Sequence, residues 1–406
     1  MKKIVVGVVI MIILTNLTGC KKNILPQRKE INDLQLVQVI GIDKLPGGAD
    51  EDCMITIASK NLEAGGVQDS SGGGGEGTGA GQTKALVLTA EGKTLFDAVR
   101  NIKTHSNKTI FWGHADYFLI GEEAARDDIA KYIDFFTRDH ELRIDSKIYI
   151  VKGSTAKDLI EEFNRSNFYI ADKLESLGHN FKLLSNSKEL EVHELMRFID
   201  IHHASARVPC IYLTTRNRGN EEQTNDIESC GYAIFSGLKL AGFIGTDISR
   251  GINIITNTVD SSIVSVKDPS GQDVALEIIG CKTKVIPFFN GDELVSITLK
   301  TNVTSNLGEI QSQTDLTDKN TLSYLESQQS KVLKDEMEKV LEKILEFKSD
   351  CLEICDGIRL SKPLKWHKIE DQWMQILPEI KFDIQVESKI QRTYDMREPS
   401  GSKRRE

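Results

Sequence analysis

The stretch ADYFLIGEEAARDDIAKYIDFFTR, residues 115–138, decides the fold class of this 406-residue chain. Its first seven residues form a short apolar run that ends at Gly121 and predicts a buried strand. From Glu122 the pattern predicts a helix with one apolar face, formed by Ile129, Tyr132, Ile133 and Phe136. A strand followed directly by an amphipathic helix is typical of a sheet with helices packed on it.

The same alternation continues on both sides of this stretch. Toward the N-terminus it predicts strands over residues 30–43, 54–59 and 85–89, then a helix from the N-cap Thr94 to Ile102. Toward the C-terminus it predicts a strand over 147–151, a helix over 154–163 and a mostly helical region over 172–200. The first half is therefore predicted to be an α/β layer with a mixed sheet.

The second half is richer in strands. Ser236-Gly237 and Asn290-Gly291 read as hairpin turns, and residues 322–347 carry an apolar stripe that predicts a helix about 40 Å long. Residues 382–390 read as a closing strand. We therefore predict an α+β, multi-domain fold with mixed sheets and packed helices, arranged as two to three domains in series.

The polar run RNRGNEEQTN, residues 216–225, is the strongest candidate for a domain boundary. The glycine-rich residues 65–82 are predicted to be a flexible loop, since they lack the GxxxxGK[ST] pattern of a phosphate-binding loop. The predicted organisation is a signal peptide (1–19), an N-terminal α/β region (20–215), a linker (216–228), a C-terminal α+β domain (229–395) and a charged tail (396–406).

Composition argues against one class of partner. The chain is 39% hydrophobic and 27% charged, as is usual for globular proteins, and its formal net charge of −9 argues against binding to nucleic acid. Of its seven cysteines, six lie beyond Cys20. Their spacing suggests buried thiols more than a disulfide scaffold, although an occasional bridge is compatible with an exported protein.

Cys20 is the predicted site of a lipid anchor. Lys2 and Lys3 precede the apolar run Ile4–Leu14, and Leu17-Thr18-Gly19-Cys20 follows it as a small-residue processing site. The apolar run is shorter than the roughly 20 residues that a membrane span needs, so a signal peptide is favoured over a transmembrane helix. The tetrapeptide resembles a bacterial lipobox, which implies that the mature chain begins at a lipidated Cys20.

Two groups of residues suggest metal or redox chemistry. His202-His203 lack partners at the spacing of a metal site, so a solvated pair is favoured. Cys351 and Cys355 are four residues apart and continue the apolar stripe of the long helix, so core packing is favoured over a redox site.

Two further groups suggest catalysis or ligand binding. His114 lies near Asp116, as a general base and its orienting group would, but no nucleophile motif follows. Trp366 and Trp373 are seven residues apart and share a face on a helix, which is more typical of a core or an interface than of a ligand cage. No catalytic, cofactor-binding or metal-binding residue is therefore predicted.

Several segments together resemble the Ger(x)C family, the lipoprotein C subunits of nutrient germinant receptors in endospore-forming bacteria. The ordered matches are the lipobox at 17–20, EINDLQLVQVIGID from Glu30, GKTLFDAVRNI from Gly92, residues 113–143, YAIFSGLKLAGFI from Tyr232, and PLKWHKIEDQWMQILPEIKFDIQVESKIQRT from Pro363. They cover most of the mature chain. The ordered set behind a lipobox is more specific than any single segment.

The resemblance implies a protein lipid-anchored to the outer face of the cell membrane or the inner spore membrane. It implies two partners, an A subunit with soluble and membrane domains and a polytopic B subunit, which together sense small nutrients and trigger germination. It implies no enzymatic activity and no cofactor. The alternative is a solute-binding lipoprotein that delivers a small molecule to a membrane transporter; a lipid-anchored hydrolase that uses His114 is the least favoured hypothesis.

Overall fold

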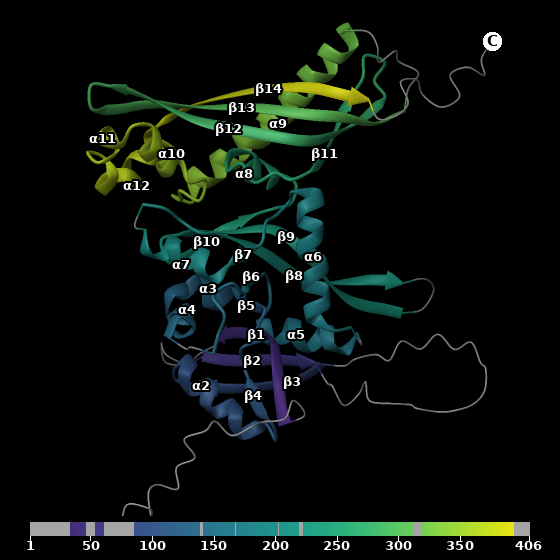
Figure 1. The fold of residues 1–406 in the computed structure, drawn as a ribbon, viewed down its shortest axis with the longest axis vertical. Helices are drawn as coiled ribbons and strands as arrows, with labels where there is room; N and C mark the ends of the chain where they lie inside the picture. The colour runs from purple at the N-terminus through teal and green to yellow at the C-terminus, as the bar shows by residue number, and fades with distance from the viewer. Residues whose placement is uncertain are drawn as a thin grey trace, which may run out of the picture.

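The computed structural model describes residues 33–45, 53–60, 85–138, 141–166, 168–201, 203–218, 222–311 and 319–393. Two β-sheets follow one another along the long axis of the molecule, each with helices packed on it (Figure 1). Both sheets mix parallel and antiparallel pairs, so the predicted α+β class with mixed sheets is confirmed. The signal peptide, Cys20, the glycine-rich residues 65–82 and the tail 396–406 lie outside the described residues.

The first sheet has ten strands, in the order β10-β9-β8-β6-β5-β1-β2-β3, with β4 beside β1 and β7 beside β6. Its central pairs, β1–β5, β5–β6 and β6–β8, are parallel, and the pairs at both edges are antiparallel. The strands are β1 (Leu34–Lys44), β2 (Cys53–Lys60), β3 (Ala85–Gly92), β4 (Thr109–Phe111), β5 (Tyr117–Gly121), β6 (Lys147–Val151), β7 (Leu190–Glu191), β8 (Arg207–Arg218), β9 (Glu222–Ser236) and β10 (Lys239–Ile244).

Helices cover both faces of this sheet. One buried cluster joins α5 and α6 to one face, and a second joins α2, α3, α4 and α7 to the other. Strand side chains alternate between the two clusters, as Leu119 and Ile120 of β5 do, because successive side chains of a strand point to opposite faces. The helices are α2 (Leu95–Ile102), α3 (Glu122–Asp127), α4 (Ile129–Arg138), α5 (Ala156–Arg165), α6 (Ile170–Leu184) and α7 (Val192–Asp200), with a 3-10 turn η2 (Lys103–His105) after α2.

The stretch that indicated the fold class forms a strand and helices as predicted, with one difference. The helix expected over 122–138 is divided into α3 and α4 at Asp128. The Asp128 side chain accepts a hydrogen bond from Ala130 N at 3.0 Å, so it begins the second helix as a cap. The predicted N-cap Thr94 is confirmed, since its Oγ1 accepts a hydrogen bond from Asp97 N at 3.2 Å.

The linker expected over residues 216–228 is wrong. Residues 216–218 belong to β8 and residues 222–228 to β9, and the two strands pair antiparallel from Arg207↔Ile234 to Arg218↔Glu222. Because β9 and β10 also belong to the first sheet, this sheet extends to Ile244, past the predicted boundary. The remaining domain boundaries stay predictions.

The second sheet has four strands, in the order β11-β12-β13-β14. The long helix α9 packs against β14 and β11, and α8 packs against α9 (Figure 1). Gly291 has a positive φ of 60° at the β12–β13 turn, which confirms the hairpin expected at Asn290-Gly291. The elements are α8 (Arg250–Ile255), β11 (Ser262–Lys267), β12 (Asp273–Asn290), β13 (Glu293–Ile310), α9 (Lys319–Glu346) and β14 (Lys381–Thr393).

Short helices connect α9 to β14: α10 (Ile354–Ser361), α11 (Pro363–Trp366), η3 (Glu370–Gln372), α12 (Trp373–Ile376) and η4 (Leu377–Glu379). The long helix ends at Glu346, so the expectation that Cys351 and Cys355 lie on it is wrong. Cys351 precedes α10 and Cys355 lies within it. Both side chains are buried, which agrees with the expected core position.

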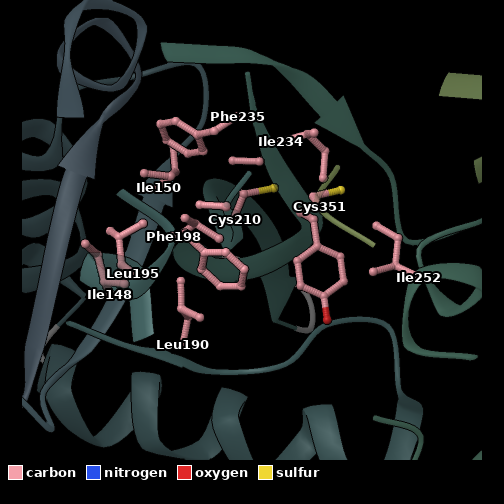
Figure 2. Packing of buried hydrophobic residues seen from close by; sticks show 14 of the residues in the cluster. Ile148, Ile150, Leu190, Leu195, Phe198, Cys210, Ile234, Phe235, Ile252 and Cys351 are labelled. Carbon is pink, nitrogen blue, oxygen red and sulfur yellow. The ribbon is translucent and has the colours of Figure 1, made fainter. Parts of the chain in front are cut away.

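The two sheets share one apolar core. Figure 2 shows Leu195 and Phe198 of α7, Phe235 of β9 and Ile252 of α8 packed around Cys210 and Cys351. Residues from β11 to β14 continue the same buried cluster. The two sheets, each with its helices, are therefore joined by apolar packing as well as by the polypeptide chain.

Asp43 connects the first strand to a helix far along the sequence. Its Oδ1 and Oδ2 accept hydrogen bonds from Ala156 N at 2.7 Å and Lys157 N at 2.9 Å, so it caps the N-terminus of α5. Burial raises the pKa of Asp43 to about 6. A Cβ at Gly121 would collide with Asp43 Oδ1, so this position on β5 requires glycine for the cap to form.

Among the helices that the structure describes, none is both long enough and apolar enough to cross a membrane.

Candidate functional site

Three residues that the sequence analysis considered as parts of a metal or ligand site, His203, Trp366 and Trp373, lie close together at the junction between the two sheets. The Trp366 and Trp373 rings lie 5.4 Å apart at an interplanar angle of 69°, an edge-to-face contact. The centre of the His203 ring lies 5.0 Å from that of Trp366. The tryptophans come from separate short helices, α11 and α12, and both are buried, which favours the core interpretation over a ligand cage.

Asp350 is the polar centre of this junction, although the sequence analysis did not select it. Its carboxylate accepts hydrogen bonds from Ile354 N at 2.9 Å, Cys355 N at 2.9 Å and Trp373 Nε1 at 2.8 Å. Its backbone oxygen accepts a hydrogen bond from Ser205 N at 3.3 Å, just before β8. Complete burial raises the pKa of Asp350, and the three donors act against this rise. Asp350 therefore fixes α10, the Trp pair and the first sheet relative to one another.

Beside Asp350, a cluster of charged side chains forms a second polar contact between the two sheets. Arg207, at the start of β8, donates to Cys351 O at 2.6 Å and to Glu353 Oε1 at 2.9 Å. Arg197 of α7 lies 3.4 Å from the other Glu353 oxygen. Burial acts to raise the pKa of Glu353, but the two guanidinium groups hold it below its ordinary value. An ionised Glu353 therefore joins α7 and β8 to the segment that begins α10.

A hollow of about 240 Å³ opens next to this ion pair. It adjoins a second hollow of about 320 Å³ through the shared residues Lys188, Glu189, Glu194 and Thr258. The charges that line the first hollow balance, with three cations facing three carboxylates: Lys188, Arg197 and Arg207, and Glu189, Glu194 and Glu353. The lining therefore carries no net formal charge.

The buried thiols at the junction are poor nucleophiles. Burial raises the pKa of Cys351 to about 12, and burial together with Asp350 raises that of Cys355 further. Thiols with such pKa values stay protonated near neutral pH, whereas the reactive form of cysteine is the thiolate. The redox role considered for this pair is therefore not supported.

The other sequence candidates are not brought together as a catalytic or metal site. The His114 ring contacts Phe111 at 5.7 Å, and Asp116 pairs with Arg143 at 3.9 Å. Within the described ranges, no group of three or more His, Cys, Asp or Glu side chains is arranged to hold a metal ion. His202 lies outside the described residues.

One disulfide, Cys210–Cys230, joins β8 to β9 with its Cα atoms 5.3 Å apart. The sequence left open whether any pair of cysteines is bridged, because spacing alone does not reveal which cysteines meet. Adjacent antiparallel strands place these two side by side. Cys53, Cys281, Cys351 and Cys355 do not take part in a disulfide.

Comparisons with known proteins match both halves of the chain. The family model for the spore germination protein N-terminal domain matches residues 27–212, and the spore germination B3/GerAC-like C-terminal model matches residues 230–394. The chain is 25% identical to spore germination protein B3 of Bacillus subtilis over 320 residues, which cover 77% of this chain and 82% of that protein.

A solved structure also resembles this one. The crystal structure of the GerBC protein matches with a TM-score of 0.54 and 20% sequence identity, over 86% of this chain and 97% of that chain. At this identity the likeness shows a shared fold.

Proposed function

The chain belongs to the Ger(x)C family of spore germination proteins, and from this membership we propose that it is a lipid-anchored, non-catalytic C subunit of a nutrient germinant receptor. The observation that carries the proposal is the match of both family domains, in order, from residue 27 to residue 394. Shared membership over both domains supports a shared role more strongly than a match to one domain does.

The anchor is proposed at Cys20, on the outer face of the cell membrane or the inner spore membrane. Because β1 begins at Leu34, residues 21–33 would connect the proposed lipid to the first sheet, and we refer to them as the tether. Thirteen residues reach at most about 45 Å when fully extended. The body would therefore stay close to the membrane in which its partners lie.

The proposed role is to bind an A subunit and a polytopic B subunit. Anchoring to the same bilayer raises the effective concentration of the body beside these partners. The raised pKa of the buried Cys351 thiol supports a role in which this cysteine performs no catalysis. No nucleic-acid partner is proposed, in keeping with the net charge of −9.

The alternative, a solute-binding lipoprotein, fits the architecture less well. Such a protein needs two lobes around a cleft, whereas the two units here have ten and four strands in unrelated orders. Tight binding of an amino acid or a sugar to this chain alone, measured by calorimetry, would favour the alternative.

Nutrient-triggered germination of spores that lack the gene tests the proposal. We expect these spores to lose the response to at least one nutrient and to regain it when the wild-type gene is restored. The readout is the fall in refractility after nutrient addition. Full responses to all nutrients, in a strain that also lacks paralogous receptors, would contradict the proposed role.

A further inference from the structure

The end of the molecule that contains α2, η2 and β4 is basic, although the chain as a whole is acidic. Residues 93–114 contain Lys93, Arg100, Lys103 and Lys108 against one acidic residue, Asp97, whereas the formal net charge of the chain is −9. In Figure 1 these elements lie at the lower end of the long axis, opposite the second sheet. We refer to residues 93–114 as the α2–β4 end.

Two of the basic side chains of this end, Arg100 and Lys103, are exposed, and Lys108 is half-buried. His105 is exposed as well, and its Nδ1 lies 3.0 Å from Thr89 O. Asp97, the acidic residue of this end, lies in the first turn of α2. Residues 98–114, which run from there through η2 and β4, contain basic residues and no acidic residue.

Two exposed aromatic rings accompany these cations. Phe96 is 48% exposed and Phe111 is 36% exposed. The Arg100 guanidinium lies 4.4 Å from the centre of the Phe96 ring. Basic side chains beside exposed phenylalanines are typical of surfaces that lie at the interface of an anionic bilayer.

The proposed tether enters the body at this same end. β1 begins at Leu34, which pairs with Thr109 of β4, and Leu36 pairs with Phe111. Ser106, between η2 and β4, donates to Gln35 Oε1 at 2.8 Å. Residue 33 is thus adjacent to the basic surface, and the tether itself carries Lys21, Lys22, Arg28 and Lys29 against two acidic residues.

We propose that the α2–β4 end lies on the anionic lipid headgroups of the bilayer that holds the anchor. This inference rests on the proposed lipid anchor at Cys20. The cations of this end are attracted to the negative headgroups, while the acidic remainder of the body is repelled from them. The second sheet is thereby held away from the membrane, and the body has a defined orientation.

Hydrogen exchange on the lipidated chain in vesicles tests this orientation. We expect the backbone amides of residues 98–111 to exchange at least about fivefold more slowly on vesicles with phosphatidylglycerol than on vesicles of phosphatidylcholine alone. Salt near 1 M, where the Debye length falls to about 3 Å, should abolish the difference. The double variant Arg100→Glu/Lys103→Glu should abolish it as well.

The matched control is Lys282→Glu/Lys284→Glu, which reverses two exposed cations on β12 of the second sheet. This control should keep the protection of residues 98–111. Equal exchange on both kinds of vesicle, with the wild-type chain still bound to them, would overturn the inference and leave the anchor intact. If the chain dissociates from phosphatidylcholine vesicles, the lipid anchor is refuted. In that case, binding of the chain to phosphatidylglycerol vesicles would still support the basic membrane-facing surface, whereas no binding to them would overturn the inference.

Discussion

Replacing Cys20 by alanine is expected to release the protein from the membrane and to impair nutrient-triggered germination. A diacylated cysteine holds a protein stably because each buried CH₂ contributes about 0.8 kcal/mol, whereas the tether alone offers a few cations. The apolar run Ile4–Leu14 is too short to replace the lipid as a span of roughly 20 residues. Loss of the anchor also removes the gain in effective concentration beside the partner subunits.

Fractionation and intact-mass measurement check this expectation. The wild-type chain should be found with the membranes and carry the mass of a lipid on its first residue, Cys20. The control is Cys281→Ala, which removes a free, partly buried thiol of the second sheet and should leave both the fractionation and the lipid mass unchanged. Unchanged membrane association and mass in Cys20→Ala would refute the lipid anchor.

The second large effect is expected at Asp350, where alanine should destabilise the fold by about 4 kcal/mol. The substitution leaves the backbone N–H groups of Ile354 and Cys355 and the Trp373 indole N–H buried without their acceptor. Each unsatisfied buried donor costs about 1–3 kcal/mol. Because α10 and the Trp pair both depend on this carboxylate, the junction should loosen as a unit.

Urea unfolding followed by tryptophan fluorescence measures this loss, since two of the three tryptophans, Trp366 and Trp373, lie at the junction. The matched control is Asp356→Ala, in α10, whose carboxylate pairs with the half-exposed Arg359. It should cost less than about 1 kcal/mol, as exposed ion pairs do. Similar unfolding midpoints for both variants would contradict the role assigned to Asp350.

The sequence predicted the elements whose apolar pattern is strong and local. Within residues 115–138, β5 is buried on both faces and appears as a continuous apolar run, whereas α4 and the long helix α9 each present one apolar face to the core, so their period shows directly in the sequence. The hairpin of β8 and β9 escaped prediction because its outer part, around Arg216 and Thr224, is polar and has no alternating apolar face. In the amino-acid sequence, a strand without an alternating apolar face cannot be distinguished from a polar linker.

The polar contacts of the junction could not be predicted for a different reason. Arg207 and Glu353 are 146 residues apart, and no local pattern indicates that they meet. Asp350 gave a weak signal, as an acidic residue shortly before a helix start. The Trp pair was correctly expected in a core or an interface, but only the structure shows that two short helices, and not one, bring the rings together.

Co-purification from spore membranes tests the central claim most directly. The lipidated chain, carrying an affinity tag and solubilised in mild detergent, should bring down a polytopic membrane protein together with a second subunit that has soluble and membrane domains. The same subunits should be depleted when Cys20→Ala replaces the wild type. Recovery of the lipidated chain alone, from membranes that contain both candidate subunits, would contradict the account of this protein as a receptor subunit.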